Sequence, residues 1–459
     1  MPTAHAHSHN RHAHEGMPKI PDWLTVEQAL ERILSYVTPL PAEQRALLES
    51  LGQVLAADVR APLDVPPHAN SSMDGYAVQW ESVRHASGQH PARLRVTGTL
   101  AAGQAPSSAV APGTAIRIMT GAPIPPGADT VVPFEDTDEL ARAQRGEPVA
   151  GEVAVMAAPA ARGANIRDAG EDIARGATVL TAGTVLRPAE IGILASLGMV
   201  AAPVIRRPVV AILSTGDELA EPPAPLAPGQ IYNSNSFTIA ASVLRYGGVP
   251  RVLGVARDTL DSLRAKIADG LSADMLITTA GVSRGDYDIV KDVLMQQGEI
   301  AFWTVRMKPA KPLAFGTLQA QGPDGKARRV PHLGLPGNPV SSLVAFEQFG
   351  RPAILKMLGK RTLAKPVIRA VLKDDIVNTD ERRVYARVSV TLRDGVAYAR
   401  LTGPQGSGVL TSMAKADGLA ICPEDTLVLR AGETADIQML DWPEDRFADP
   451  LRPTPGGAS

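Results

Sequence analysis

From about Arg207 onward, short apolar runs alternate with amphipathic stretches along the chain. The run at 209–213 predicts a buried strand, and the spacing of apolar residues over 236–246 predicts a helix. The same alternation predicts further strands at 252–255 and 275–277, and helices at 259–271 and 289–297. Strands that alternate with helices indicate a parallel sheet with right-handed crossovers, whose ligands bind at the carboxyl ends of the strands.

Two other regions have β-like patterns. Between about Arg60 and Arg162, short runs such as 94–96 and 115–118 are separated by turns rich in proline and glycine, which predicts an inserted β domain. Alternation over 385–390 predicts a second β domain near the C-terminus. Residues 25–28 form a capping box before an apolar helical face, so a helix is expected to begin there.

The chain therefore has an α/β region combined with β-rich domains, and its 459 residues are enough for several hydrophobic cores. We expect a His-rich tail (1–16), a helical or mixed linker domain (17–60 with 163–206), an inserted β-rich domain (61–162), an α/β domain (207–362), a C-terminal β domain (363–445) and a loose tail (446–459).

Composition narrows the class of function. The net charge of −2, from 46 basic and 48 acidic residues, offers no general attraction to nucleic acid or to an acidic membrane surface, so neither is an expected partner. The single cysteine, Cys422, excludes a disulfide framework and a cysteine-rich metal site, and is most simply a small core residue. The chain contains neither a membrane-length apolar run nor a signal-peptide pattern, so a cytoplasmic location is expected.

The N-terminal tail holds five of the nine histidines, at positions 5, 7, 9, 12 and 14. Imidazoles at such spacing can chelate nickel, copper or zinc, which suggests a metal-binding arm. A tail without a role is the favoured interpretation, because chain termini are commonly disordered and the tail contains no thiolate.

The segment at 308–312 and the turn at 334–339 together predict an anion-binding cleft. Lys308 and Lys311 each precede a proline in a short, stiff segment, so their cationic groups are held at defined places. The turn at 334–339 opens a helix and directs backbone N–H groups forward. Its residues expected to shape the site are Pro336, Gly337, Asn338 and Pro339. A solvated surface charge is the alternative interpretation of Lys311.

Acidic loops follow the predicted strands upstream. Glu218, Asp258 and Asp288 each come after a strand end, so they are expected to converge on one crevice. Carboxylates beside lysines suit a Mg²⁺-assisted reaction of a phosphate or another oxyanion, and we therefore expect an enzyme.

The order of several motifs resembles a known family. The motifs are Ser71–Ala77, Arg117–Pro123, 170–172, Ser214–Leu219, Gly281–Ser283, Lys308–Pro312 and Gly334–Ser341. They occur in the order seen in molybdopterin molybdenumtransferases, which are the MoeA proteins and the C-terminal domain of gephyrin. The resemblance covers about Pro21 to Leu440.

The resemblance implies an elongated four-domain homodimer with a central molybdopterin-binding domain, which performs the last step of molybdenum cofactor synthesis. In that step adenylylated molybdopterin is hydrolysed, molybdate enters the dithiolene and AMP leaves. Mg²⁺ would be held by Glu218, Asp258 and Asp288, and contact with other molybdenum cofactor proteins is implied. The resemblance assigns catalytic roles to Asp74, Thr120, Asp172, Glu218, Asp258, Asp288 and Lys308, with Asp74, Thr120 and Asp172 reaching the cleft of the partner chain. It assigns substrate binding to Ser214, Thr215, Gly216, Gly281, Val282, Ser283, Lys311, Pro336, Gly337, Asn338 and Pro339.

Three positions depart from the family pattern. Family members often have a basic residue where Thr304 stands, and glycine where Ala280 and Ala310 stand. The two alanines add methyl groups where backbone is expected to approach a ligand. Two alternative functions stay open, namely a catalytically weak molybdopterin-binding scaffold of the same fold and a molybdopterin adenylyltransferase.

Overall fold

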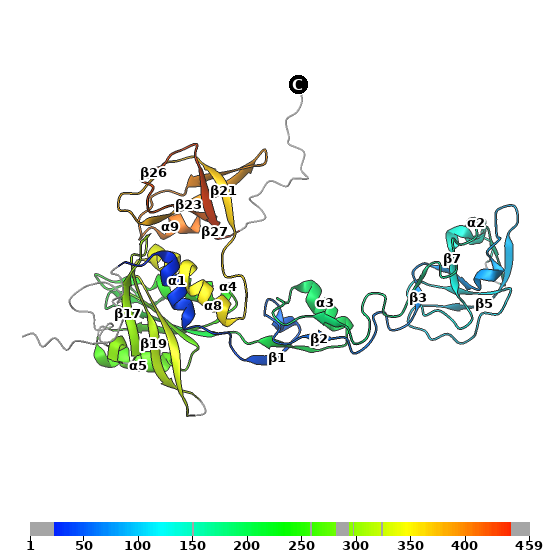
Figure 1. The fold of residues 1–459 in the computed structure, drawn as a ribbon, viewed down its shortest axis with the longest axis horizontal. Coiled ribbons are helices and arrows are strands. Elements are labelled where there is room, and N and C mark those ends of the chain that lie inside the picture. Colours follow the sequence, from blue (N-terminus) through cyan, green and yellow to red (C-terminus); the bar gives the residue numbers. More distant parts are fainter. Residues whose placement is uncertain are drawn as a thin grey trace, which may run out of the picture. The chain divides into compact units, whose positions relative to one another are not determined.

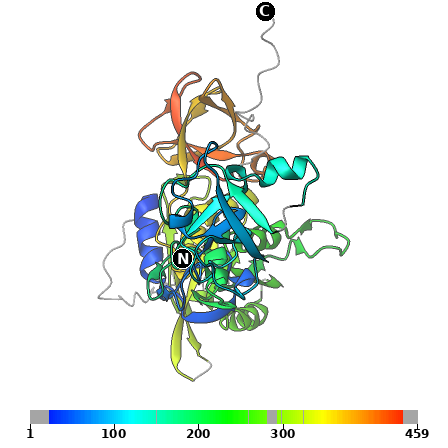
Figure 2. The same ribbon diagram turned by 90° about the vertical axis from the view of Figure 1, so that its right-hand side faces the viewer.

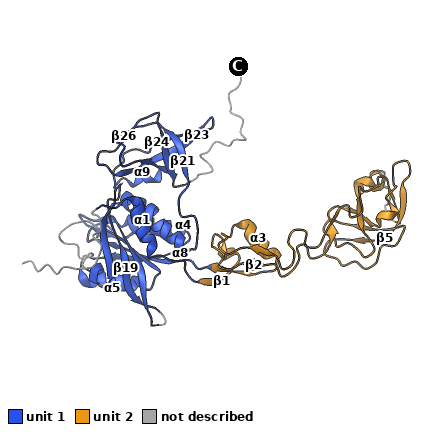
Figure 3. Cartoon of the chain, viewed as in Figure 1, with its two compact units in different colours: residues 1–41, 205–459 blue, residues 42–204 orange. Residues whose placement is uncertain are grey.

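The computed structural model describes residues 23–148, 151–257, 259–280, 293–296, 298–322 and 325–441. The chain divides into two compact units, one of residues 1–41 with 205–459 and one of residues 42–204, shown in different colours in Figure 3. Within the described residues, no helix is both long and apolar enough to cross a membrane. The His-rich tail, the C-terminal tail and most of the helix expected at 289–297 lie outside the described residues.

The first unit is built on a six-stranded sheet. Its strands, in spatial order, are β15 (Val249–Ala256), β12 (Val209–Thr215), β16 (Met275–Thr279), β20 (Ala327–Leu335), β19 (Pro312–Gln321) and β17 (Gly298–Thr304). The pairings from β15 to β20 are parallel, as the sequence predicts. The pairings of β19 with β20 and β17 are antiparallel, and the sequence analysis predicted none of these three strands. A short connection joins β19 to β20, and strands joined this way must run antiparallel.

Helices cover both faces of this sheet because side chains of a strand alternate in direction. On β12, Val210 and Ile212 share a core with Ile239 of α4, while Leu213 packs with Leu263 of α5 in a second core. The helices of this unit are α1 (Val26–Ser35), α4 (Ser234–Arg245), α5 (Leu260–Gly270), α7 (Pro339–Ala345), the π-helical turn η4 (Phe346–Gly350), α8 (Arg351–Met357) and α9 (Leu410–Ala414). The capping box before α1 is present as predicted, with Gln28 N–H donating to Thr25 Oγ1 over 3.2 Å.

The C-terminal strands close into a barrel. Pairings run from β23 (Arg383–Arg393) through β24 (Val396–Leu401), β21 (Val367–Leu372), β27 (Thr434–Met439) and β25 (Gly418–Cys422) back to β23. Cys422 is buried in the barrel core, which confirms its predicted role. The two-residue strand β18 (Met307–Lys308) pairs with β23, and β22 (Ile376–Val377) pairs with β26 (Val428–Leu429). Figures 1 and 2 show strands β21 to β27, coloured gold to red, as a body beside the α/β sheet.

The second unit contains two separate groups of cores. A five-stranded sheet has the order β7 (Thr130–Pro133), β4 (Gly75–Val78), β6 (Thr114–Ile118), β5 (Ala92–Leu100) and β8 (Glu152–Val155), with α2 (Glu139–Gln144) nearby in sequence. The other core surrounds α3 (Pro188–Ser196). Its strand pairs are β1 (Ala42–Ala46) with β11 (Ala201–Ile205) and β2 (Val59–Arg60) with β10 (Thr178–Leu180). Separate cores support an inserted β domain, whose predicted boundaries stay a prediction.

Shorter elements complete the described fold. They are the paired strands β3 (Asn70–Ser71) and β9 (Ile166–Arg167), the paired strands β13 (Leu219–Ala220) and β14 (Ile231–Tyr232), and the single 3₁₀ turns Leu48–Ser50, Trp80–Ser82 and Phe134–Asp136.

Candidate functional site

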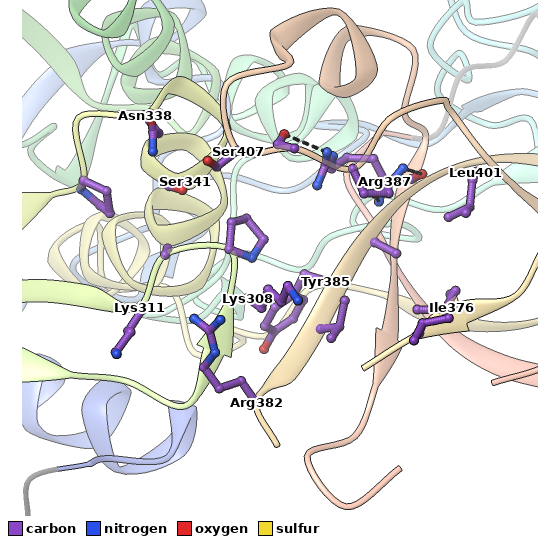
Figure 4. Close-up of a pocket in the computed structure, with 18 of the residues that line it drawn as sticks. Lys308, Lys311, Asn338, Ser341, Ile376, Arg382, Tyr385, Arg387, Leu401 and Ser407 are labelled. Carbon is purple, nitrogen blue, oxygen red and sulfur yellow. Dashed lines mark hydrogen bonds between the residues drawn. The ribbon is translucent and has the colours of Figure 1, made fainter. Parts of the chain in front are cut away.

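A cavity of about 640 Å³ lies between the α/β sheet and the C-terminal barrel. On the α/β side it is lined by residues 308–312 and by Pro336, Asn338 and Ser341, and on the barrel side by Arg382, Tyr385, Arg387 and Ser407, among others. Figure 4 shows strand β23, with Tyr385 and Arg387, facing the segment that carries Lys308 and Lys311. The sequence therefore predicted one half of this cavity, and the barrel supplies the other half.

The charge of the described lining is strongly positive. Lys308, Lys311, Arg382 and Arg387 line the cavity, whereas Asp375 is the one carboxylate in the described lining. An excess of cationic groups around a cavity attracts anions, and arginine recognises oxyanions through paired N–H donors. The cavity therefore has the chemistry of an anion-binding site.

Lys308 lines the cavity, and its charge is partly balanced. Its Nζ lies 3.7 Å from Asp380 Oδ2 and 3.4 Å from Thr379 Oγ1. Arg382 also pairs with Asp380, and their hydrogen bond, with the nearby charges of Arg382 and Lys308, lowers the pKa of that carboxyl. Lys311 is exposed and its Nζ lies 4.7 Å from the centre of the Trp23 ring. An incoming anion can therefore compete with Asp380 for Lys308.

Arg387 is the residue that the sequence analysis missed. Its side chain is 1% exposed and donates to Ser412 Oγ (3.1 Å), Pro404 O (3.2 Å) and Gly406 O (3.0 Å). All three acceptors are neutral, and no described carboxylate forms an ion pair with this guanidinium. Burial lowers its pKa, although arginine stays protonated at neutral pH. The signal in the sequence is an arginine between Ala386 and Val388, in a strand whose neighbouring side chains are apolar.

The helix start at the cavity has the predicted form. Asn338 is the N-cap of α7 and makes no side-chain cap hydrogen bond, and Pro339 occupies the first turn. Ser341, in the same turn, lines the cavity. Gly337 precedes the cap, and its carbonyl accepts from Asn235 Nδ2 over 2.7 Å. Pro336 is buried and lines the cavity, whereas Pro339 lies outside the lining, and the roles expected of both prolines stay predictions.

The end of β12 differs from the expected loop. Ser214 and Thr215 belong to the strand and are buried. Ser214 Oγ lies 2.8 to 3.0 Å from the side-chain oxygens of Thr279, Ser236 and Asn233, so its hydroxyl is already fully engaged. The first residue after the strand is Gly216, with φ +138°, and its backbone lies directly under the Glu218 carboxylate.

The expected acidic crevice is described only in part. Strands β15, β12 and β16 are adjacent and parallel, so their carboxyl ends meet at one edge of the sheet. Glu218 is exposed beyond the end of β12. Asp258, Asp288, Gly281, Val282 and Ser283 lie outside the described residues. Within the described ranges, no group of three metal-ligating side chains forms, and Glu218 does not line the cavity.

Asp74 and Thr120 form a hydrogen-bonded pair in the second unit. Asp74 Oδ1 accepts from the Thr120 backbone N–H over 2.6 Å and from its hydroxyl over 2.8 Å. These two bonds lower the pKa of Asp74, so the carboxylate is held ionised and oriented. Gly75 must be glycine, because a Cβ there would lie 2.0 Å from the Val132 carbonyl oxygen. Asp172 lies in another loop of the same unit, where its backbone N–H donates to Val65 O.

Two departures from the family pattern fall on unusual backbone. Ala280 has φ +78° and Ala310 has φ +76°, in the left-handed region that favours glycine. Ala310 lines the cavity, and the Cβ of Ala280 would lie 3.4 Å from a Cβ at Gly337. The fold therefore keeps a glycine-type backbone with alanine in place. Thr304 is 8% exposed at the end of β17, outside the cavity lining.

Comparisons with protein families match three consecutive segments of the chain. Residues 24–198 match the MoeA N-terminal region (domain I and II). Residues 211–356 match a probable molybdopterin binding domain, and residues 369–440 match the MoeA C-terminal region (domain IV). The cavity is therefore lined by residues of the second and third matched segments.

Several molybdopterin molybdenumtransferases and a solved MoeA structure are similar to this chain over most of its length. A protein named molybdopterin molybdenumtransferase 2 from Mycobacterium tuberculosis is 39% identical over 403 residues, which cover 85% of this chain and 93% of that protein. A molybdopterin molybdenumtransferase from Haemophilus influenzae is 33% identical over 422 residues, covering 90% and 98%. A solved structure of a molybdopterin biosynthesis MoeA protein from Pyrococcus horikoshii has a TM-score of 0.74 at 32% identity, covering 91% of this chain and 99% of that chain.

Proposed function

Because the chain belongs to the molybdopterin molybdenumtransferase (MoeA) family, we propose that it inserts molybdenum into adenylylated molybdopterin and releases AMP. A transferase role in molybdenum cofactor biosynthesis follows from the family itself. The identity of the adenylylated substrate and the release of AMP are the finer steps that we propose.

The observation that carries the proposal is the cationic cavity between sheet and barrel. Molybdate is a dianion and an adenylylated substrate carries a pyrophosphate, so either needs several positive charges that the protein does not neutralise internally. Arg387 meets this need because it is buried beside the cavity and bonded only to neutral acceptors. Lys308 and Lys311 add charge from the opposite side.

In this proposal the cationic groups lower the repulsion that an anionic substrate presents to a nucleophile. Hydrolysis breaks the phosphoanhydride bond, with water supplying the oxygen and AMP leaving. Lys308 and Arg387 hold the oxyanion, and the backbone at Asn338 and Ser341 orients it. The sulfur ligands of molybdenum come from the substrate, so the buried Cys422 has no part in the reaction.

Mg²⁺ fits the donor set that the sequence places at the edge of the sheet. Glu218 lies at the end of β12, and Asp258 and Asp288 follow the neighbouring strands in sequence. These are hard oxygen donors, which Mg²⁺ prefers. We propose that they hold Mg²⁺, which would neutralise charge on a pyrophosphate oxygen.

We further propose that the protein is a homodimer. Helix α4 presents the exposed residues Phe237, Ala241 and Leu244 at i, i+4 and i+7, which form one apolar stripe. Phe237 is 57% and Leu244 62% exposed, and the neighbouring strand β15 exposes Val252. An apolar stripe that no described residue covers supports burial against a second copy.

Asp74, Thr120 and Asp172 are proposed to act on the substrate bound by the partner chain. A mixture of the Asp74→Asn and Lys308→Met variants tests this, because each mixed dimer would contain one intact set of groups. Recovery of AMP release on mixing is the expected result. Equally low activity in the mixture and in each variant alone would contradict the arrangement.

The direct test is to incubate the purified protein with adenylylated molybdopterin, Mg²⁺ and molybdate, and to measure AMP release and molybdenum incorporation. We expect both products, and loss of AMP release when EDTA removes the metal. Substrate binding without turnover would favour the scaffold alternative. Adenylylation of molybdopterin from ATP would favour the adenylyltransferase alternative. The MoeA regions matched on both sides of the molybdopterin-binding segment argue against that alternative.

A further inference from the structure

The helix that begins at the cavity changes its hydrogen-bond pattern partway along. Helix α7 continues into the π-helical turn η4 and then into α8 without a break. All five residues of the π-helical turn are buried, and two of them, Glu347 and Gln348, are polar. Such turns are rare and are found frequently at functional sites. The turn therefore places a carboxylate and an amide inside the protein.

Glu347 belongs to a closed cluster of three polar groups. Lys365 Nζ lies 3.0 Å from Glu347 Oε2, and the two side chains are 4% and 6% exposed. The Tyr246 hydroxyl lies 2.9 Å from both Glu347 carboxylate oxygens, and it accepts from Lys365 Nζ over 2.9 Å. Burial lowers the pKa of Lys365, which the Glu347 charge opposes. We call Tyr246, Glu347 and Lys365 the crossing cluster.

The crossing cluster lies where the chain enters and leaves the barrel. Lys365 is in the connection between α8 and β21, and its Nζ also donates to the carbonyl of Leu440, which follows β27 (3.2 Å). Gln348 Nε2 donates to Gln438 Oε1 of β27 over 2.6 Å. Arg245 of α4 donates to the same Leu440 carbonyl over 2.8 Å. The segment that enters the barrel and the segment that leaves it are therefore both hydrogen-bonded to helices of the α/β domain.

The same helix reaches the cavity. Ser341, at its first turn, lines the cavity, and Glu347 is six residues further, which is about 9 Å along a helix axis. On the barrel side, the carbonyl of Ser407 accepts from the Val340 N–H over 3.0 Å. One continuous helical segment therefore connects Ser341 in the cavity lining to the crossing cluster, and the cluster contacts the barrel.

We propose that Tyr246, Glu347 and Lys365 are positioning residues that set the orientation of the barrel on the α/β domain, and thereby the separation of Arg387 from Ser341 at the start of α7. Lys308 is already held beside β23 by the pairing of β18. An apolar pair of similar volume would often stabilise a buried site as well as an ion pair does, so stability alone does not explain the cluster. Directional bonds to Leu440 and Tyr246 fix geometry, which an apolar contact does less sharply. The effect on turnover rests on the proposed function, whereas the effect on orientation does not.

The test measures orientation and kinetics in the same variants. Spin labels at Ala265→Cys on α5 and Thr391→Cys on β23, both exposed, report the distance between the two domains without substrate. The one native cysteine is fully buried, so labelling is confined to the introduced positions. Lys365→Met should broaden or shift the label distance and raise KM for molybdate by about ten- to hundredfold, since misplacement by about 1 Å can cost as much.

Tyr246→Phe gives a milder second variant that keeps the ring stacked on Phe346 and removes only the hydroxyl. A smaller change in the same direction is expected. Leu372→Ala is the matched control, because Leu372 lies in the barrel core away from the crossing cluster. This variant should have a lower thermal midpoint, but its label distances and its KM for molybdate should equal those of the parent.

The proposal would be overturned if Lys365→Met and Tyr246→Phe both kept the label distances and the KM of the parent. The crossing cluster would then be a purely structural feature. Shifted distances in a protein whose parent releases no AMP would support the orientation claim and refute the proposed function. The two failures are thus distinguishable.

Discussion

Replacement of Arg387 by methionine tests the cavity most directly. The substitution removes a buried positive charge at similar side-chain length and leaves Lys308 and Lys311 in place. Arg393→Met is the matched control, because Arg393 is an exposed arginine on the same strand, outside the cavity lining. Both variants change the net charge equally, so a difference between them reports the local role of Arg387.

The expected size of the effect follows from the contacts. A hydrogen bond to a charged group contributes about 1.5–3 kcal/mol, which corresponds to roughly a ten- to hundredfold higher KM for molybdate. Arg387 also donates three hydrogen bonds to neutral acceptors, at about 0.5–1.5 kcal/mol each. Their loss destabilises the barrel by at most about 4.5 kcal/mol, and relief of the buried charge reduces that figure.

The assay is molybdate-dependent AMP release, at a temperature well below the thermal midpoint of each variant. We expect Arg387→Met to raise KM strongly and Arg393→Met to leave it within about twofold of the parent. Added salt should weaken molybdate binding in the parent more than in Arg387→Met. A folded Arg387→Met protein with the KM of Arg393→Met would refute the assignment of the cavity to the anion.

Three further predictions follow from single features. Ala310→Gly should raise the free energy of unfolding by up to about 1 kcal/mol. The left-handed backbone costs alanine about 1–2 kcal/mol, and the greater conformational freedom of glycine in the unfolded chain offsets part of that gain. A lower denaturation midpoint would contradict this prediction. Thr120→Val should raise the pKa of Asp74, so the acid limb of the pH profile of AMP release moves to higher pH; an unchanged limb would show that Asp74 ionisation does not limit turnover. Phe237→Asp should give monomers by light scattering, whereas Ala265→Asp on α5 should keep the parent mass.

The sequence predicted the α/β region well because its signals are local. The strands at β12, β15 and β16 and the helices α4 and α5 were expected within a few residues of their observed bounds, since apolar periodicity over one element is enough to identify each. The capping box before α1 is likewise a local signal. Strands β17, β19 and β20 were not predicted. They pair with one another across short connections, but the place of β20 in the sheet depends on its parallel pairing with the distant strand β16, which periodicity does not report.

The site divides in the same way. Lys308, Lys311 and the helix start at Asn338 were expected from short motifs, and all three line the observed cavity. Arg387 was missed because only the pairing of β18 with β23 brings it to Lys308. Ser214 was expected to bind substrate, but its hydroxyl is engaged in a buried network that holds the end of the sheet.

The burial of Arg387 joins the fold to its chemistry. A buried guanidinium costs free energy unless it is paired, and the barrel gives this one three hydrogen bonds to neutral oxygens while leaving its charge without a described carboxylate partner. A carboxylate beside it would neutralise that charge. A partner of that kind would compete with an oxyanion for the same guanidinium. Lys308 differs, because Asp380 balances it at 3.7 Å in a half-exposed position where solvent weakens the pair. An anion in the cavity therefore displaces a weak contact at Lys308 and meets an uncompensated charge at Arg387.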